Sequence, residues 1–537
     1  MGLTYVDIGA AGVALLSFLL LYLLNRNKRL DFLNGPEGEG YLLGVEYLLQ
    51  NEEHIGDLTF CWIKSFGPTY RQPGSFGQPK LVTADPRAIH HILHANVNEY
   101  PGARDIRRIF ELLFGRGVLW AVGEEHRRHR RVLSPAFSIN HLKSFGMLFE
   151  GHVAKLSEKW NAELAKGVDK FDVIPWLQKV TLDIIGESSF NYHFGAVENK
   201  PNELTKVLKD LDQLGGALPS RAQVLALCML QYIPSWFSAW QNRYFPTAVE
   251  EIAKRYLKVS NEKAREVLHE SGLLFEMNNE AEELLLTGKD RDVLSVLVKA
   301  NRAEDPRNRL TEDEVLSQIS TLIHAGHHTT GYSIVWTLYE LSCHPEDQER
   351  VYKEVKERSD SSYESLEWLG CCVKEALRLH PVIPTLIRES AVYDSIPLEI
   401  PVIGSSGKEV TEVPVIPGQR IIIDIASYNR LESVWGPDAN EWNPARFLKE
   451  NDLQRDISVG MTGNILNFSG GPKGCVGFRF ALMEIHALLD GFIERFEFRV
   501  PKGMEIRRAN MGMMLPISEI EGEKVRPGLI LDVKARV

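Results

Sequence analysis

The stretch "NFSGGPKGCVGFRFALMEI", residues 467 to 485, places one cysteine in a glycine-rich loop that runs directly into an apolar helical pattern. A cysteine is most often a small buried hydrophobic residue. Here the surroundings favour a metal ligand, because bare amides in a tight turn and the positive end of a helix from about Phe478 would stabilise the thiolate of Cys475. Four glycines permit that turn, namely Gly470, Gly471, Gly474 and Gly477.

Residues 311–346, "TEDEVLSQISTLIHAGHHTTGYSIVWTLYELSCHPE", predict one exceptionally long helix. Thr311 and Glu314 form a capping box at its start. His344 and Pro345 mark its end, which leaves about 32 residues, or roughly 48 Å of helix. A helix so long and so apolar must run through the core of the protein.

At the centre of this helix, a small pair and then a polar pair interrupt the run of larger apolar residues. Ala325 and Gly326 are small, and Thr329 and Thr330 are polar and β-branched. Small residues let a flat group approach the backbone, and a threonine hydroxyl can bend a helix by bonding back to a carbonyl group. The pattern therefore predicts a buried cofactor beside the helix.

The rest of the chain indicates a mainly α fold. From about 100 to 380, apolar residues recur at three- and four-residue spacing, as in "VIPWLQKVTLDIIGESSF". Strand-like alternation is confined to short pieces such as "FEFRV" at 496–500. We therefore expect one large helical domain with a small β-rich part and no internal repeat.

Composition and charge exclude several classes of function. The 537 residues include 61 basic and 72 acidic side chains, for a net charge of -11, and show no long basic stripe or zinc-finger spacing. Nucleic acid is therefore not an expected partner. The six cysteines are too few and too scattered for a disulfide framework, which indicates a reducing compartment.

Residues 8–24, "IGAAGVALLSFLLLYLL", form an uncharged run that is just long enough to cross a bilayer. Basic residues follow it and Asp7 precedes it, which is the reverse of a cleaved signal peptide. The positive flank predicts a single-pass membrane anchor over 1–30, with the body on the cytosolic side. After the anchor we expect a hinge over 31–40, which contains Gly and Pro, and then one large domain over 41–537. A buried core helix is the alternative interpretation of the apolar run.

The loop from Phe468 to Gly477 resembles the cysteine-ligand loop of the cytochrome P-450 haem-thiolate monooxygenases. The likeness covers the whole chain, including the anchor and hinge of microsomal members, and is strongest to fungal, basidiomycete-like members. It implies the cytochrome P-450 fold, in which a large helical domain with a long central helix adjoins a small β-rich subdomain. Three further segments follow the family's pattern, namely "AGHHTT" at 325–330, "KEALRLHP" at 374–381 and "WNPARF" at 442–447.

The resemblance implies haem b, iron protoporphyrin IX, as the cofactor and Cys475 as its axial thiolate ligand. Phe468 would pack against the haem near the sulfur, where an ordinary core phenylalanine would also lie. Ala325 and Gly326 would lie beside the haem on the long helix. The region around the cysteine loop would be fixed by a buried charge network, formed by Glu375, Arg378 and Arg446.

The haem propionates are anionic and need cationic donors, which the resemblance places at His126, Arg130 and Arg388. A surface basic helix is the alternative for the first two, because "GEEHRRHRRVLSPAFS" at 123–138 is rich in arginine. Lys473 stands where the family usually has Arg or His. A lysine meets a propionate as a point charge without a bidentate fork, which favours looser binding there.

Thr329 matches the threonine that steers protons during oxygen activation in the family, but His328 stands where an acidic residue usually precedes it. Imidazole titrates near neutrality, so we expect His328 to relay protons in place of that acid. His324 and His328 lie one helical turn apart and could instead bind zinc. No HExxH pattern or third ligand accompanies them.

By resemblance, the chain is expected to hydroxylate or epoxidise a small molecule with O2 and electrons from NADPH. The electrons would arrive through an NADPH-cytochrome reductase, with cytochrome b5 as an optional second donor, at the endoplasmic reticulum membrane. The segments that form the substrate pocket in this family are largely apolar here and predict a lipophilic substrate. They include "GALPSRAQVLALCMLQYIPSW" at 216–236, "VIPTLI" at 382–387 and "MGMMLP" at 511–516.

A terpenoid-like fungal secondary metabolite is the expected class of substrate. Fatty-acid or xenobiotic hydroxylation is an alternative within the same chemistry. A reductase-independent haem-thiolate isomerase or dehydratase is a second alternative, and a non-catalytic haem sensor is a third. Product formation from a hydroperoxide without NADPH would select the isomerase class.

Overall fold

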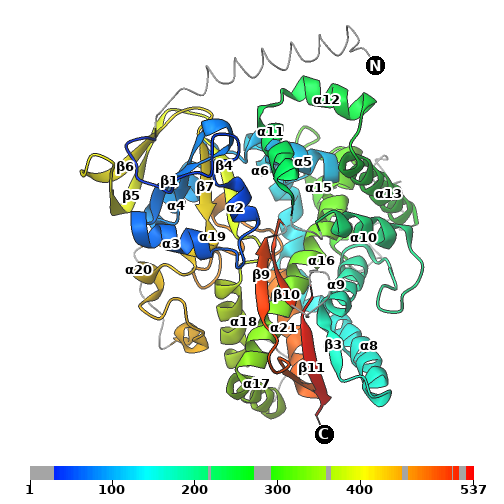
Figure 1. The fold of residues 1–537 in the computed structure, drawn as a ribbon. Coiled ribbons are helices and arrows are strands. Elements are labelled where there is room, and N and C mark those ends of the chain that lie inside the picture. The colour runs from blue at the N-terminus through cyan, green and yellow to red at the C-terminus, as the bar shows by residue number, and fades with distance from the viewer. Residues whose placement is uncertain are drawn as a thin grey trace, which may run out of the picture.

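The computed structural model describes residues 30–215, 219–270, 292–358, 365–449, 457–510, 512–518 and 528–536. It confirms the mainly α fold. Helices fill most of the molecule, with β1 and β4 to β7 gathered at the upper left and β9 to β11 in the middle and lower part, beside α16 and α21 (Figure 1). The predicted anchor over 1–30 lies outside the described residues except for Leu30. Within the described part of the chain, no helix combines the length and the hydropathy needed to cross a membrane.

The central element is α16, Glu312–Cys343, which has the length that the sequence predicts. The side chain of Thr311 accepts a hydrogen bond from the backbone of Glu314, and the side chain of Glu314 accepts one in return from the backbone of Thr311. This capping box satisfies two amide groups that a helix start leaves without partners. The helix runs through the middle of the molecule and is buried over most of its length (Figure 1).

Four helices make the most extensive contacts with α16. The predicted helix "VIPWLQKVTLDIIGESSF" forms α9, Val173–Phe190, and lies along α16. The other three are α13, Ala248–Glu270, α18, Glu367–Leu379, and α21, Phe478–Arg495. Because α18 carries the "KEALRLHP" segment and α21 follows the cysteine loop, α16 joins the predicted functional segments into one core.

The remaining helices surround this core. Their bounds are α2 Glu46–Gln50, α3 Asp57–Phe66, α4 Pro86–His90, α5 Arg104–Phe114, α6 Gly123–Leu133, α7 Ile139–Leu142, α8 Gly146–Ala165, α10 Glu203–Gly215, α11 Arg221–Met229, α12 Ser235–Tyr244, α15 Val293–Ala303, α17 Pro345–Glu357, α19 Ile425–Tyr428 and α20 Glu432–Trp435.

The strands form small sheets. One sheet has the order β1-β2-β7-β4, with β2 and β7 parallel and the other neighbours antiparallel. The predicted strand "FEFRV" forms β8, and its Phe496 and Phe498 share a buried face. The bounds are β1 Thr69–Pro73, β2 Pro79–Thr83, β3 Lys170–Asp172, β4 Thr385–Glu389, β5 Asp394–Ile403, β6 Glu409–Val415, β7 Arg420–Asp424, β8 Phe496–Arg499, β9 Ile506–Asn510, β10 Met514–Ser518 and β11 Ile530–Ala535.

The predicted hinge over 31–40 contains no helix, as its Gly and Pro residues indicate. It is nevertheless docked on the body. Leu33 is buried and forms a bridge with Gly404, and the backbone of Arg71 donates a 3.0 Å hydrogen bond to the carbonyl oxygen of Asn34. These contacts fix where the chain enters the folded domain.

Candidate active site around Cys475

The cysteine loop is a tight turn that ends at the start of α21. The backbone N–H of Cys475 donates a 2.8 Å hydrogen bond to the carbonyl oxygen of Phe468, which closes the turn. A side chain on Gly470 would place its Cβ 2.0 Å from the carbonyl oxygen of Val459. Gly471 has a φ of 65°, in the left-handed region that favours glycine. The glycines are therefore required by the close packing of this loop.

Cys475 has an exposed side chain, yet burial in the protein raises the pKa of its thiol. Both observations are explained if the sulfur faces open space inside the protein and lies away from the outer surface. A hydrogen bond from the backbone of Gly477 and the charge of Arg130 act in the opposite direction and favour the thiolate. The loop therefore presents its sulfur to open space, as a metal ligand requires.

The centre of α16 also has an open face. Ala325 is exposed although its helix runs through the core, and Thr329 is half-buried. The hydroxyl of Thr329 donates a 2.8 Å hydrogen bond to the carbonyl oxygen of Ala325. This is the backbonding that threonine favours within a helix.

Gly326 also has a packing role. A Cβ on Gly326 would lie 2.6 Å from the Cδ1 atom of Ile185 on α9. The missing side chain therefore allows α9 and α16 to approach closely, and the hydroxyl of Thr181 on α9 donates a 3.1 Å hydrogen bond to the carbonyl oxygen of His327. Of the small pair, Ala325 is exposed and Gly326 is half-buried.

Cationic side chains gather near the cysteine loop. Arg130 on α6 donates a 2.8 Å hydrogen bond to the carbonyl oxygen of Gly474 in the loop itself. Burial, followed by the charges of Arg388 and Arg107, lowers the pKa of Lys473 to about 8. Burial lowers the pKa of Arg388 to about 10, and its buried Nε has no hydrogen-bond partner. These groups repel one another, so the cluster needs an anion.

The described residues supply no carboxylate within ion-pair distance of these four cations, which are Arg107, Arg130, Arg388 and Lys473. An uncompensated buried charge is costly, and an anionic partner removes that cost. The two propionates of a haem fit this requirement. Arg107 was not identified from the sequence, because it lies in the arginine-rich segment "RDIRRIF" with no motif to single it out.

His126 differs from the cationic donor that the sequence suggested. It is buried, and burial together with the charges of Lys473 and Arg130 lowers its pKa to about 4. Burial and these charges thus favour the neutral imidazole, which can still donate a hydrogen bond, whereas an anion bound in the cluster would act in the opposite direction. Its neighbours Lys473 and Arg130 belong to the cationic cluster, so the structure does bring the predicted residues together.

The structure also joins Glu375, Arg378 and Arg446. The carboxylate of Glu375 accepts hydrogen bonds from Arg378 Nε at 2.7 Å and from Arg446 Nε at 3.0 Å, and all three side chains are almost fully buried. Arg446 also forms a 2.9 Å ion pair with Asp438. Arg378 donates further to the carbonyl oxygens of Asn429 and Ala439, so α18 is bound to the segment before the cysteine loop.

The rings of three histidines lie in contact on α16. The ring of His328 is 5% exposed and lies with its centroid 3.8 Å from that of His327 and 5.0 Å from that of His324. Among the described residues, no group of three or more side chains has the geometry of a metal site. The zinc interpretation of His324 and His328 therefore gains no support.

Two of the expected pocket walls, 382–387 and 511–516, meet beside α16. The segment before α6 also contacts this helix, since the backbone of Val118 donates a 3.0 Å hydrogen bond to the side chain of Gln318. The backbone of Met514 donates to the carbonyl oxygen of Val382, and its own carbonyl oxygen accepts from Trp336 on α16. Met511 and residues 216–218 of the expected walls lie outside the described residues.

The comparisons with known proteins agree with this geometry. Residues 35–522 match the cytochrome P-450 family. Cytochrome P-450 monooxygenase claQ of Ampulloclitocybe clavipes is 30% identical over 511 residues, which cover 93% of this chain and 92% of that protein. Cytochrome P-450 monooxygenase 128 of Postia placenta is 30% identical over 548 residues, which cover 98% of this chain and 97% of that protein. The chain therefore belongs to the cytochrome P-450 family and is a haem-thiolate monooxygenase that uses O2 and a redox partner.

Proposed function

We propose that this monooxygenase hydroxylates or epoxidises a neutral, lipophilic small molecule of the terpenoid-like class of fungal secondary metabolites. The observation that carries the proposal is the lack of charge beside the open face of α16. The ring of His324 lies 5.0 Å from that of Phe114 and 6.1 Å from that of Tyr256. Burial, followed by the charge of His328, lowers the pKa of His324 to about 3. This wall is uncharged at neutral pH and suits a neutral ligand.

The residues of this chain have distinct roles in the proposal. Haem held by a cysteine thiolate supplies the activation of dioxygen for oxygen insertion. Cys475 would hold the iron, while Arg130, Arg388 and Lys473 would hold the propionates. The hydroxyl of Thr329 holds a proton on the open face of α16, next to Ala325.

Co-expression with an NADPH-cytochrome reductase tests the class of substrate. Neutral terpenoids and fatty acids of similar size are supplied to the holoenzyme, and products are identified by mass spectrometry. We expect an NADPH-dependent product that carries one added oxygen atom from a neutral terpenoid. Products from the fatty acids alone would contradict the proposal, and rearranged products from a hydroperoxide without NADPH would indicate the isomerase class.

The relay of protons by His328 is a second part of the proposal. His328 is buried and directly precedes Thr329 on α16. Replacing His328 with alanine is expected to lower the fraction of NADPH electrons that reach product by at least about tenfold, since general acid-base groups typically contribute factors of about 100 to 10,000. The measurement is product formed per NADPH consumed.

A matched control for this variant is His327→Ala. His327 is also buried, but its Nδ1 forms a 2.7 Å hydrogen bond with the carbonyl oxygen of Ile323, and its backbone faces α9. We expect His327→Ala to retain the coupling of the parent enzyme. Equal coupling in His328→Ala and the parent would rule out the relay.

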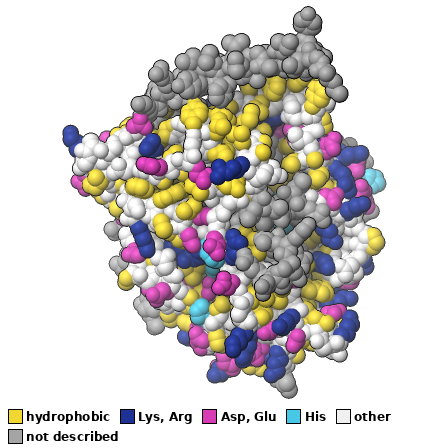
Figure 2. All heavy atoms as spheres, viewed as in Figure 1, with side chains coloured by type: hydrophobic (Ala, Val, Ile, Leu, Met, Phe, Trp, Pro, Cys, Tyr) yellow, Lys and Arg dark blue, Asp and Glu magenta, His cyan; other side chains and the backbone are white. Residues whose placement is uncertain are grey.

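We also propose that the protein is anchored in the endoplasmic reticulum membrane by residues 1–30 and that its folded domain touches the bilayer. Exposed aromatic side chains cluster on and after α12, with Trp236 at 71%, Trp240 at 47% and Phe245 at 66% exposure. Figure 2 shows hydrophobic side chains gathered over the end of the molecule that carries α11 and α12. Such side chains favour the boundary between headgroups and acyl chains.

The place where the chain enters the folded domain supports contact between this end of the molecule and the bilayer. Tyr41 and Leu42, which follow the predicted hinge, are 45% and 49% exposed. They precede α2, and α2 packs against α11, where Arg221 lies over the ring of Tyr47 at 4.5 Å. The segment after the predicted anchor therefore lies at the same end of the molecule as the exposed aromatic residues.

Removing residues 1–30 is expected to leave measurable binding to lipid vesicles. In that truncated protein, the double substitution Trp236→Ser and Trp240→Ser is expected to weaken vesicle binding at least about tenfold, because each buried aromatic residue contributes on the order of 1 kcal/mol or more. Co-sedimentation with vesicles measures the effect. Tyr393→Ser is the control, since Tyr393 is 77% exposed but lies between β4 and β5. Loss of all binding on truncation alone would contradict contact between the domain and the bilayer.

A further inference from the structure

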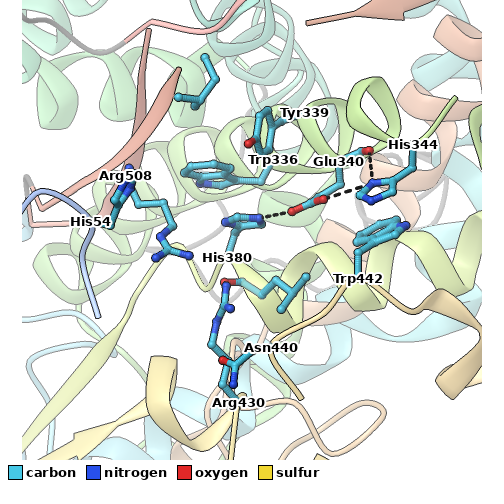
Figure 3. Close-up of a pocket in the computed structure, with 12 residues that line it drawn as sticks. His54, Trp336, Tyr339, Glu340, His344, His380, Arg430, Asn440, Trp442 and Arg508 are labelled. Carbon is cyan, nitrogen blue, oxygen red and sulfur yellow. Dashed lines mark hydrogen bonds and ion pairs between the residues drawn. The ribbon is translucent and has the colours of Figure 1, made fainter. Parts of the chain in front are cut away.

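A second cavity lies at the C-terminal ends of α16 and α18, beside β9 (Figure 3). Its volume is about 380 Å³. None of the residues assigned to the haem site lines it. The lining residues are His54, Trp336, Tyr339, Glu340, His344, Leu379, His380, Arg430, Asn440, Trp442, Ile506 and Arg508.

Flat rings form much of the wall. The indole of Trp336 stacks on the imidazole of His380 with centroids 4.1 Å apart and planes 2° apart. The ring of His344 stacks on that of Trp442 at 5.3 Å and 16°. Figure 3 shows these two stacked pairs on either side of Glu340. Rings of this kind favour a ligand with a flat apolar body, which can pack offset or edge-on against them.

The one carboxylate that lines the cavity is already engaged. Glu340 forms a 2.5 Å hydrogen bond with His380 Nε2 and lies 3.5 Å from His344 Nδ1. Burial acts to raise the pKa of Glu340, but the contacts with these two histidines outweigh burial and hold that pKa below its usual value. Burial lowers the pKa of His380 to about 4, so this ring is neutral near pH 7.

Two arginines reach the cavity from different elements. Arg430 donates a 2.8 Å hydrogen bond from Nη2 to the carbonyl oxygen of Leu379. Burial, followed by the charges of Arg508 and Arg378, lowers the pKa of Arg430 to about 9. No carboxylate among the described residues forms an ion pair with Arg430, so its charge is incompletely balanced.

Arg508 on β9 has donor capacity to spare. Its Nη2 donates a 2.6 Å hydrogen bond to Asp57, whose carboxylate is 53% exposed at the rim. The buried Nε of Arg508 has no hydrogen-bond partner. A buried donor without a partner is costly, and a ligand that accepts a hydrogen bond removes that cost.

We propose that this cavity binds a small organic carboxylate, with its anionic group at Arg430 and Arg508 and its flat body against the stacked rings. A carboxylate matches the planar fork of a guanidinium group. The cavity exceeds the space that a single inorganic ion needs, since a water molecule takes only about 30 Å³ of liquid volume. The occupant would contact α16, the helix that also carries Thr329.

Calorimetric titration of the full-length holoenzyme with benzoate tests the site. Benzamide is the neutral ligand of the same shape, and inorganic phosphate is the anion without a flat body. We expect benzoate to bind with a Kd on the order of 1 mM, the affinity of a small ligand with one charged contact. Benzamide and phosphate are expected to bind at least about tenfold more weakly.

Arg508→Gln is the test variant and Arg507→Gln is its matched control. Both remove one positive charge from β9, but Arg507 does not line the cavity. We expect Arg508→Gln to weaken benzoate binding at least about tenfold and Arg507→Gln to leave it unchanged. Circular dichroism verifies that both variants are folded. The proposal fails if benzoate gives no binding heat, if benzamide or phosphate binds equally well, or if Arg508→Gln binds benzoate as the parent does.

Discussion

Replacing Cys475 with serine is expected to abolish NADPH-dependent oxygenation, with a loss of at least about 1,000-fold, or ~4 kcal/mol in activation free energy. Serine preserves the size of the side chain in a loop where Gly470 and Gly471 leave no room for change. Its hydroxyl does not ionise near neutral pH, so it lacks the electron donation that a thiolate provides to haem iron. The measurement is product formed per haem at saturating reductase.

Cys61→Ser is the control for this variant. Cys61 is an exposed cysteine on α3 and belongs to none of the elements that carry the candidate site. We expect this variant to retain the turnover of the parent and thereby to exclude a general effect of losing a thiol. Turnover of Cys475→Ser within about tenfold of the parent would contradict the assignment of the thiolate.

Replacing Glu375 with alanine is expected to lower the free energy of unfolding by about 3–5 kcal/mol. Glu375 is completely buried and accepts hydrogen bonds from Arg378, Arg446 and the backbone of Asn443. Its removal leaves two buried guanidinium groups without their shared carboxylate. Because folded proteins are stable by only about 5–15 kcal/mol, we expect little haem-loaded protein to accumulate.

Urea unfolding and the ratio of haem to protein measure this effect. Glu367→Ala is the control, since Glu367 lies on the same helix, α18, but is exposed. Glu375→Gln, which keeps the shape of the side chain without its charge, is expected to fall between the two. Equal stability and equal haem content in Glu375→Ala and Glu367→Ala would show that the buried network does not support the fold.

Elements with strong local signals could be predicted from the sequence. The bounds of α16 follow from the capping box at Thr311 and from Pro345, because both act within one helical turn. The helix α9 was equally clear from its apolar spacing. The close approach of α9 and α16 could not be predicted, because the contact between Gly326 and Ile185 joins residues that are distant in the sequence.

The same distinction holds within the candidate site. The resemblance to the family's motifs identified Glu375, Arg378 and Arg446, but Asp438 and the carbonyl acceptors of Arg378 depend on how a loop without regular structure folds. The neutral state of His126 depends on burial beside Lys473 and Arg130, which no local pattern encodes. Arg107 and the cavity at Arg508 likewise arise from long-range packing.

The carbon monoxide difference spectrum of the reduced, purified protein tests the central claim most directly. We expect the strongly red-shifted Soret band that a cysteine thiolate ligand would give to the carbon monoxide complex, and we expect its loss in Cys475→Ser. A band at the shorter wavelength typical of a neutral trans ligand in freshly prepared, folded protein would contradict thiolate ligation by Cys475.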